Sequence, residues 1–285
     1  MNKKQLQEMI AEVTRGKEFD GSQMWEIEEG LKNSLSVAQV QSYAKPEFDP
    51  EQMEQIRWGF EYGLTTEQIQ VYARPELYFT QMHEIRLGFK NGLSKEQIQY
   101  YSDGKKFNPN EMYEIRKGFE DGLTIEQIQQ YANGMFDSLQ MDIIRIGFTN
   151  GLCMEQMQKY IDAENIFDCE EMEEIRLGFE KGLSINQIQV YADSDFNYSQ
   201  MEQIRFGFEH DLSMEQVEVY ANPKIDYEQM QKIRTGFENG VTVEQMKQVL
   251  GIAEQEKPSV SEKLDSMDHT PCTTTDSQNR DETVK

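Results

Sequence analysis

The chain has 285 residues, a formal net charge of −24 and three cysteines. An acidic surface of this kind repels nucleic-acid phosphates and anionic lipid, so neither direct nucleic-acid binding nor membrane binding is expected. The cysteines have neither the spacing of a disulfide framework nor that of a zinc site, which argues against both of these classes.

The N-terminal segment, residues 1–18, has no apolar run long enough for a signal peptide or a membrane span. Its apolar residues Leu6, Met9, Ile10 and Val13 have helical spacing. We predict a helix that caps the start of the domain that follows. Without an export signal or paired cysteines, a reducing cytoplasm is the expected compartment.

Residues 19–250 repeat one pattern eight times, and the clearest copy is FDPEQMEQIRWGFEYGLTTEQIQVYA, residues 48–73. The copies follow one another at intervals of 29 to 31 residues. A fixed period of this length is typical of stacked repeat arrays. The methionines that align the copies are Met24, Met53, Met82, Met112, Met141, Met172, Met201 and Met230.

The first half of each copy predicts a helix of about 13 residues, called helix A below. In the copy at residues 48–73, Asp49 is a suitable N-cap, and Gln52 can complete a capping box with it. Met53, Ile56 and Phe60 then share one helical face. Tyr78 takes the N-cap position in the third copy, where we expect a weaker start.

The second half predicts a glycine turn and a helix B of about 8 residues. Gly63 ends helix A because glycine adopts the left-handed conformation without penalty. Thr65 and Gln68 form a second capping box, and Ile69 and Tyr72 supply the apolar side. Ser34 and Asp211 are poorer stops than glycine, and Cys153 is an unusual second cap.

A pair of helices this short cannot bury its apolar side alone, whereas stacked pairs can. We therefore predict an all-α solenoid of eight tandem helix-turn-helix hairpins. The predicted domains are an N-terminal capping helix at 1–18, the solenoid at 19–250 and a disordered polar tail at 251–285. The tail is rich in Ser, Thr, Asp and Lys and lacks the repeat pattern.

An arginine follows the helix A isoleucine in seven of the eight copies, and we call this set the arginine ladder. One interpretation is a row of guanidinium groups that binds an extended anion. The other, which we favour, is structural: each arginine lays its stem on the core and pairs with an acid, such as the one four residues on. The ladder comprises Arg57, Arg86, Arg116, Arg145, Arg176, Arg205 and Arg234.

A glycine in the middle of every helix A and a tyrosine in seven helix B segments also recur. An internal helix glycine costs roughly 1 kcal/mol relative to alanine, so we expect a neighbouring group to approach closely there. The tyrosine spacing indicates core, with the hydroxyl reaching a backbone group. Ligand approach and ligand stacking are the alternatives at these two positions.

The residue after each ladder arginine is apolar in five copies, and we call these five side chains the apolar ridge: Trp58, Leu87, Ile146, Leu177 and Phe206. A helical wheel places them almost opposite the core face. They either pack between adjacent repeats or form a surface stripe that binds a protein.

No residues match a catalytic, cofactor or metal site. His83, His210 and His269 have no partner at metal or catalytic spacing, and no phosphate loop, dinucleotide fingerprint or calcium loop is present. We therefore expect no cofactor, no metal and no enzymatic activity. A cryptic enzyme would require a closed pocket that the repeats do not predict.

The repeat resembles the α-solenoid class that includes tetratricopeptide and HEAT repeats, although it lacks the tetratricopeptide signature. YAKPEFDPEQMEQIRWGFEYGL, residues 43–64, is similar to a YA-x-PEFD-x-x-QM-x-EIR-x-GFE-x-GL repeat of uncharacterised proteins from Gram-positive bacteria and their mobile elements. The resemblance covers about 19–250 and implies a cytoplasmic bacterial or phage-related protein without a transferable activity. Residues 233–251 also resemble a DNA-binding helix-turn-helix. Six of the eight helix B segments carry a glutamate near their start, and this acidic charge argues against DNA contact.

Two functions remain open from the sequence. The first is a non-enzymatic scaffold or adaptor that binds a protein through an extended acidic surface with the apolar ridge. If charge attracts the partner, that partner is basic. The alternative is an acidic mimic of nucleic acid that inhibits a basic DNA-binding protein, as in anti-restriction. Partner binding that weakens steeply as the salt concentration rises would distinguish the mimic from the scaffold.

Overall fold

The structure is a computed structural model that describes residues 2–161 and 167–251. Within these ranges it contains seventeen helices and no strand, so the protein is all-α. The predicted tail, 251–285, lies outside the described residues except for Gly251.

The chain begins with α1 (Lys3–Thr14), and A and B helices then alternate to the end of the described residues. The A helices have 12 residues each: α2 (Gly21–Lys32), α4 (Pro50–Glu61), α6 (Phe79–Lys90), α8 (Pro109–Glu120), α10 (Ser138–Thr149), α12 (Cys169–Glu180), α14 (Tyr198–Glu209) and α16 (Tyr227–Glu238).

The B helices are shorter and more variable: α3 (Val37–Tyr43), α5 (Thr66–Tyr72), α7 (Lys95–Tyr101), α9 (Ile125–Tyr131), α11 (Met154–Ile161), α13 (Ile185–Ile188), α15 (Met214–Glu218) and α17 (Val243–Leu250). The expectation of about 8 residues was wrong for α13 and α15, which have 4 and 5 residues. Below, each A helix together with the B helix that follows it is called a hairpin, and the hairpins are numbered 1 to 8 from α2 to α16.

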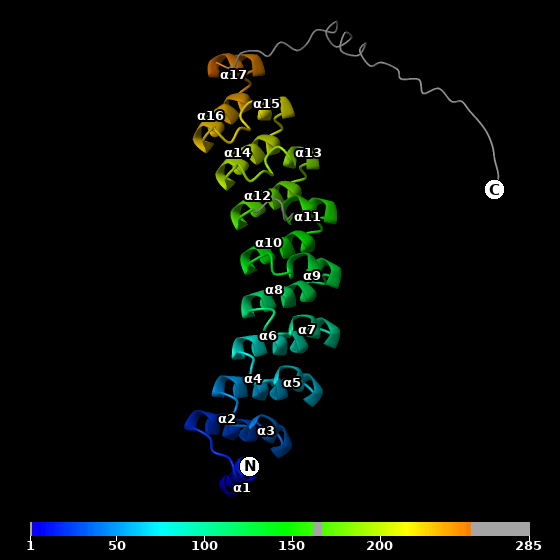
Figure 1. Ribbon diagram of the computed structural model, residues 1–285, viewed down its shortest axis with the longest axis vertical. Helices are drawn as coiled ribbons and strands as arrows, with labels where there is room; N and C mark the ends of the chain where they lie inside the picture. The colour runs from blue at the N-terminus through cyan, green and yellow to red at the C-terminus, as the bar shows by residue number, and fades with distance from the viewer. Residues whose placement is uncertain (1, 162–166, 252–285) are drawn as a thin grey trace, which may run out of the picture.

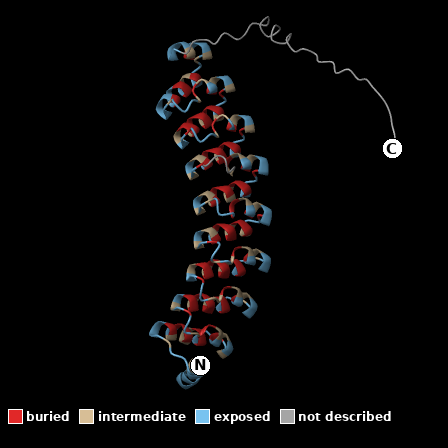
Figure 2. Ribbon diagram, viewed as in Figure 1, coloured by how far each residue is buried: buried red, intermediate tan, exposed pale blue. Residues whose placement is uncertain are grey.

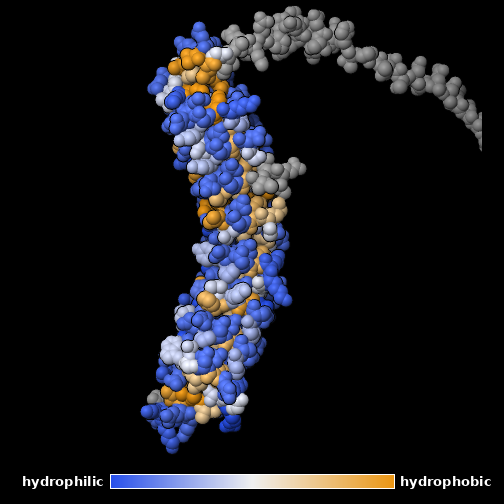
Figure 3. Space-filling model, turned by 60° about the vertical axis from the view of Figure 1, so that its left-hand side comes forward, coloured by the Kyte–Doolittle hydropathy of each residue, from blue (hydrophilic) through white to orange (hydrophobic). Residues whose placement is uncertain are grey.

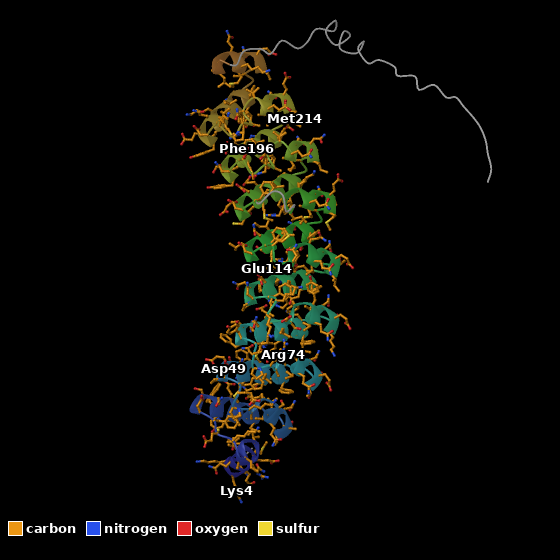
Figure 4. The ribbon with its side chains drawn as sticks, in the orientation of Figure 1. Lys4, Asp49, Arg74, Glu114, Phe196 and Met214 are labelled. Carbon is orange, nitrogen blue, oxygen red and sulfur yellow. The ribbon has the colours of Figure 1, made fainter. Side chains whose placement is uncertain are left out.

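The helix boundaries follow from local hydrogen bonds. At α4 the Asp49 carboxylate accepts from the Gln52 amide at 2.7 Å, and the Gln52 side chain accepts from the Asp49 amide at 3.0 Å (Figure 4 labels Asp49). At α6 the Tyr78 side chain makes no cap, and only the Gln81 side chain accepts from the Tyr78 amide, at 3.1 Å.

The turns after the A helices use a left-handed residue. Gly63 has φ 84°, which glycine adopts without steric cost. Ser34 and Asp211 take the same region at φ 71° and 63°, where a Cβ is unfavourable. Both were expected to be poorer stops.

The hairpins stack along one long axis, with the A helices on one side and the B helices on the other (Figure 1). Each A helix contacts the A helix before it and the one after it, from α2 to α16. α1 packs on α2 and α3 at the N-terminal end. Figure 2 shows the buried residues as a continuous strip through the middle of the stack, with exposed residues at the helix ends.

Within a hairpin, the recurring glycine and tyrosine meet. The Tyr43 hydroxyl donates to the Glu26 carbonyl at 3.0 Å, and a Cβ on Gly30 would lie 2.1 Å from that hydroxyl. The glycine therefore leaves the space that the tyrosine hydroxyl occupies. Tyr160 differs, because its hydroxyl bonds the Met157 sulfur at 2.9 Å instead of a carbonyl.

Between hairpins, the glutamine of the first capping box reaches the next loop. The Gln52 amide group donates to the carbonyls of Pro75 and Leu77 at 3.0 and 2.6 Å. Gln23, Gln81 and Gln200 make equivalent pairs of bonds. One side chain thus begins a helix and also links two hairpins.

None of the described helices has the length and apolar character needed to cross a lipid bilayer.

Candidate binding surface along the A helices

The five apolar ridge residues each lie on a different A helix. All five are half-buried and lie outside the buried core. The ridge therefore follows the A side of the stack and does not converge on one pocket. Lys117 of hairpin 4 interrupts it, and Glu29 and Thr235 take the same position in the end hairpins 1 and 8.

The ends of the apolar ridge contact the arginine ladder. The Trp58 ring lies 5.8 Å from the Arg57 guanidinium and 5.2 Å from that of Arg86. The Phe206 ring lies 4.6 Å from the Arg205 guanidinium and 5.6 Å from that of Arg234. These aromatic rings cover guanidinium groups of their own and the next hairpin, a favourable cation–π arrangement.

The ladder arginines are tied to the preceding hairpin. In six of them Nε donates to a glutamate or glutamine that stands two residues after the preceding methionine: Glu26, Gln55, Glu84, Glu114, Glu174 and Gln203, at 2.7 to 3.3 Å. Figure 4 labels Glu114, the acceptor for Arg145, in the middle of the stack. Sequence reasoning missed these acceptors, although their constant offset from the methionine was visible.

Each ladder arginine except Arg86 and Arg145 also pairs with the acid four residues on, as expected from the sequence: Glu61, Glu120, Glu180, Glu209 and Glu238. A side chain from the preceding hairpin often bonds the same carboxylate. Asn33 donates to Glu61 at 2.8 Å, and Asn91 donates to Glu120 at 2.8 Å.

Burial and charge act in opposite directions on these groups. Burial acts to lower the pKa of Arg57, Arg116 and Arg205, but the bonded carboxylates outweigh it, and each pKa lies above its ordinary value. Burial raises the pKa of Glu84 and Glu174 despite their arginine partners. This close pairing fits the structural interpretation of the ladder.

Two ladder positions depart from the pattern. Nε of Arg176 is buried without a hydrogen-bond partner in the described part of the chain, because Ile143 stands where other hairpins have glutamate or glutamine. Arg86 hydrogen-bonds the side chains of Gln55 and His83 and has no carboxylate partner among the described residues.

Five exposed aromatic side chains lie on the first four hairpins, and two more, Tyr198 and Tyr227, lie on hairpins 7 and 8. Trp25 and Tyr62 are each about half exposed, at 50% and 52%, and Tyr78, Phe79 and Tyr113 are exposed as well. Trp25 and Tyr113 stand four residues before the ridge position of their helices, and Tyr62 stands four residues after it, which places them on the same helical side. That spacing was a signal the sequence reasoning did not use.

A shallow pocket of about 350 Å³ lies between α6 and α8, with Phe79, His83 and Tyr113 in its lining. Burial lowers the pKa of His83, and the nearby Arg86 and Arg116 lower it further, which favours the neutral imidazole. Its Nδ1 lies 3.0 Å from an Arg86 nitrogen and accepts from it. The pocket thus joins aromatic walls to the arginine ladder.

Among the described residues, no three or more His, Cys, Asp or Glu side chains are grouped so that they could hold a metal ion.

Figure 3 shows that the surface turned toward the viewer is largely hydrophilic, with hydrophobic side chains in an interrupted line along the stack.

Comparisons with protein-family models, with curated proteins and with solved structures find no match to this chain.

Proposed function

We propose that the protein is an α-solenoid of eight helical hairpins that acts as a non-enzymatic scaffold or adaptor. It binds a protein partner through the A side of the stack, with the apolar ridge as the contact surface. We place it in a bacterial cytoplasm, on the resemblance of residues 43–64 described above and on cysteines without pairing spacing.

The observation that carries this proposal is the position of the apolar ridge. Its five side chains lie outside the core and are not fully covered by the neighbouring hairpins. Apolar side chains that are surrounded by charged groups and aligned along one side are typical of protein-binding surfaces. The core beneath them is built from other positions of the repeat, so these residues can vary without loss of the fold.

The acidic mimic of nucleic acid remains the second candidate because of the net charge of −24. A mimic needs carboxylates that are free to imitate phosphates. Glu61, Glu120 and Glu180 are instead held by ladder arginines. This pairing makes the scaffold the better-supported function.

Photo-crosslinking tests the scaffold directly. A benzoylphenylalanine at Leu87 or Leu177 should crosslink to a protein in the source cell, because both positions lie on the apolar ridge. The same residue at Asn186, an exposed position of helix α13, is the control and should not. Equal crosslinking at Asn186 and Leu177 would contradict the assignment of the ridge.

A further inference from the structure

Arg86 is the one ladder arginine for which the described structure contains no carboxylate partner. Each of the other six makes an ion pair with at least one Asp or Glu. Arg86 is also the most deeply buried of the seven, with 3% of its surface exposed. A buried guanidinium without a carboxylate is costly, because its desolvation is not offset by an opposite charge.

Four substitutions in the repeat produce this difference. Gln55 takes the place of the glutamate that accepts from Nε. His83 also bonds Arg86 but supplies no negative charge. Lys90 stands four residues after Arg86, where hairpins 2, 4, 6, 7 and 8 have glutamate. Tyr62 replaces the asparagine with which hairpins 1, 3 and 5 bind the carboxylate of the next hairpin.

The result is a local cluster of positive charge on a strongly acidic chain. The Lys90 ammonium lies 4.1 Å from the Tyr62 ring centre, and the Arg86 guanidinium lies 5.5 Å from it. The ring of Trp58, an apolar ridge residue, lies 5.2 Å from the Arg86 guanidinium. Two cations and two aromatic rings thus lie side by side, and no described ion pair uses either cation.

Electrostatics sets this position apart from the others. Burial lowers the pKa of Arg86, whereas carboxylates raise the pKa of Arg57, Arg116, Arg145 and Arg205. The nearest acids are already engaged: Glu84 accepts from Arg116 at 2.8 Å, and Glu54 lies 3.9 Å from Arg57. An added carboxylate would therefore meet a guanidinium that has hydrogen bonds but no ion-pair partner in the described structure.

We propose that Arg86 and Lys90 bind a carboxylate of a protein partner, at the position that a glutamate of the chain itself takes in the other hairpins. This inference rests on the proposed scaffold function and names the chemistry of the partner segment: a glutamate or aspartate flanked by apolar residues. The flanking residues contact Trp58 and Tyr62. A partner can be basic overall and still present this one acid.

The local charges favour a carboxylate over a phosphate. Arg234, whose Nε also bonds a glutamine, pairs with a single carboxylate, that of Glu238, so one carboxylate is enough for a ladder arginine in this setting. A doubly charged phosphate would be repelled by Glu54 and Glu84, which lie near Arg86, and by the acidic chain as a whole.

The test uses a defined peptide and the fluorescence of Trp58. A Trp25→Phe substitution leaves Trp58 as the only tryptophan of the chain. The peptide acetyl-Ala-Leu-Glu-Leu-Ala-amide should change the Trp58 emission in a saturable way. Its twin with glutamine in place of glutamate should bind about tenfold more weakly, because the charge-assisted hydrogen bonds are lost.

Lys90→Glu is the decisive variant, since it supplies the carboxylate found in other hairpins. It should abolish binding of the glutamate peptide and raise the melting temperature. Lys95→Glu changes the net charge equally at an exposed position of α7 and should leave binding intact.

Equal binding by wild type and Lys90→Glu would overturn the proposal, as would equal binding of the two peptides or no binding of either. Displacement of the peptide by an equal concentration of inorganic phosphate would overturn the carboxylate assignment. All these results leave crosslinking at Leu177 unaffected, so failure here is distinguishable from failure of the scaffold function.

Discussion

Among single residues, Ile143 shows what the repeat requires, because it removes one acceptor from the arginine ladder. Ile143 takes the sequence position of the glutamate or glutamine that accepts from the other arginines, and Nε of Arg176 has no hydrogen-bond partner among the described residues. The hairpin 5–6 contact therefore lacks one buried hydrogen bond that the other contacts have.

Ile143→Glu should restore this bond and stabilise the protein. We expect the free energy of unfolding to rise by about 1 kcal/mol, the net value of one intramolecular hydrogen bond. Urea denaturation measures it. Ile143→Met, which keeps an apolar side chain and adds no acceptor, is the control and should give no gain. A stability of the Met variant equal to that of the Glu variant would contradict the explanation.

The pairing of glycine and tyrosine provides a second test at this scale. Gly207→Ala should destabilise by about 1 to 3 kcal/mol through overpacking, because the new Cβ would lie 2.0 Å from the Tyr220 hydroxyl. Tyr220→Phe in the same chain should recover part of that loss, since it removes the oxygen. Thermal denaturation of the two single variants and the double variant measures the coupling, and strictly additive effects would argue against it.

The helices themselves are encoded locally, and the sequence therefore predicted most of their boundaries. N-caps such as Asp49 and stops such as Gly63 act within a few residues, so they can be read without knowledge of the fold. The short helices α13 and α15 were not predicted, because their caps match those of the longer B helices.

Contacts between hairpins were much less accessible from the sequence. The second role of Gln52, which links two hairpins, and the acceptor role of Glu26 depend on how the hairpins are offset in the stack. The apolar ridge could be located by its helical position, but its half-buried state depends on the neighbouring helices. The cluster at Arg86 was not predicted, because it differs from the other hairpins in its ion pairs, and these depend on side-chain positions.

The start of helix α6 lacks a side-chain cap, and a substitution there should stabilise the helix. Tyr78 gives no side-chain cap, unlike the residues that begin the other A helices. Tyr78→Asp should stabilise the protein by about 1 kcal/mol, through a cap on the Gln81 amide. Tyr78→Ala removes the same ring without adding a cap and should give no such gain. Thermal denaturation would contradict the assignment if both variants behaved alike.

For the whole molecule, the stacked arrangement implies that damage stays local. In the described part of the chain, the main helix contacts join a hairpin to its immediate neighbours, so stability is approximately a sum over hairpins and their contacts. Ile144→Asp would bury an unpaired charge in the middle of the stack. Hydrogen exchange should then accelerate in α10, in α11 and in the adjacent helices, while α2 keeps its protection. Uniform acceleration from α1 to α17 would contradict this view.

The central claim is that the apolar ridge binds a protein. The most direct measurement is capture of partners from the source cell at low and high salt. A variant with Trp58, Leu87, Leu177 and Phe206 changed to serine is compared with wild type. The control carries serine at Ile125, Met135, Met154 and Val249, which are exposed apolar residues on B helices or, for Met135, in the loop before α10.

We predict one partner that wild type and the control retain at both salt concentrations and that the ridge variant loses. An apolar contact depends little on salt, whereas contacts between exposed charges weaken as salt rises. A partner that all three proteins hold at low salt and release at high salt would contradict the ridge and favour the acidic mimic.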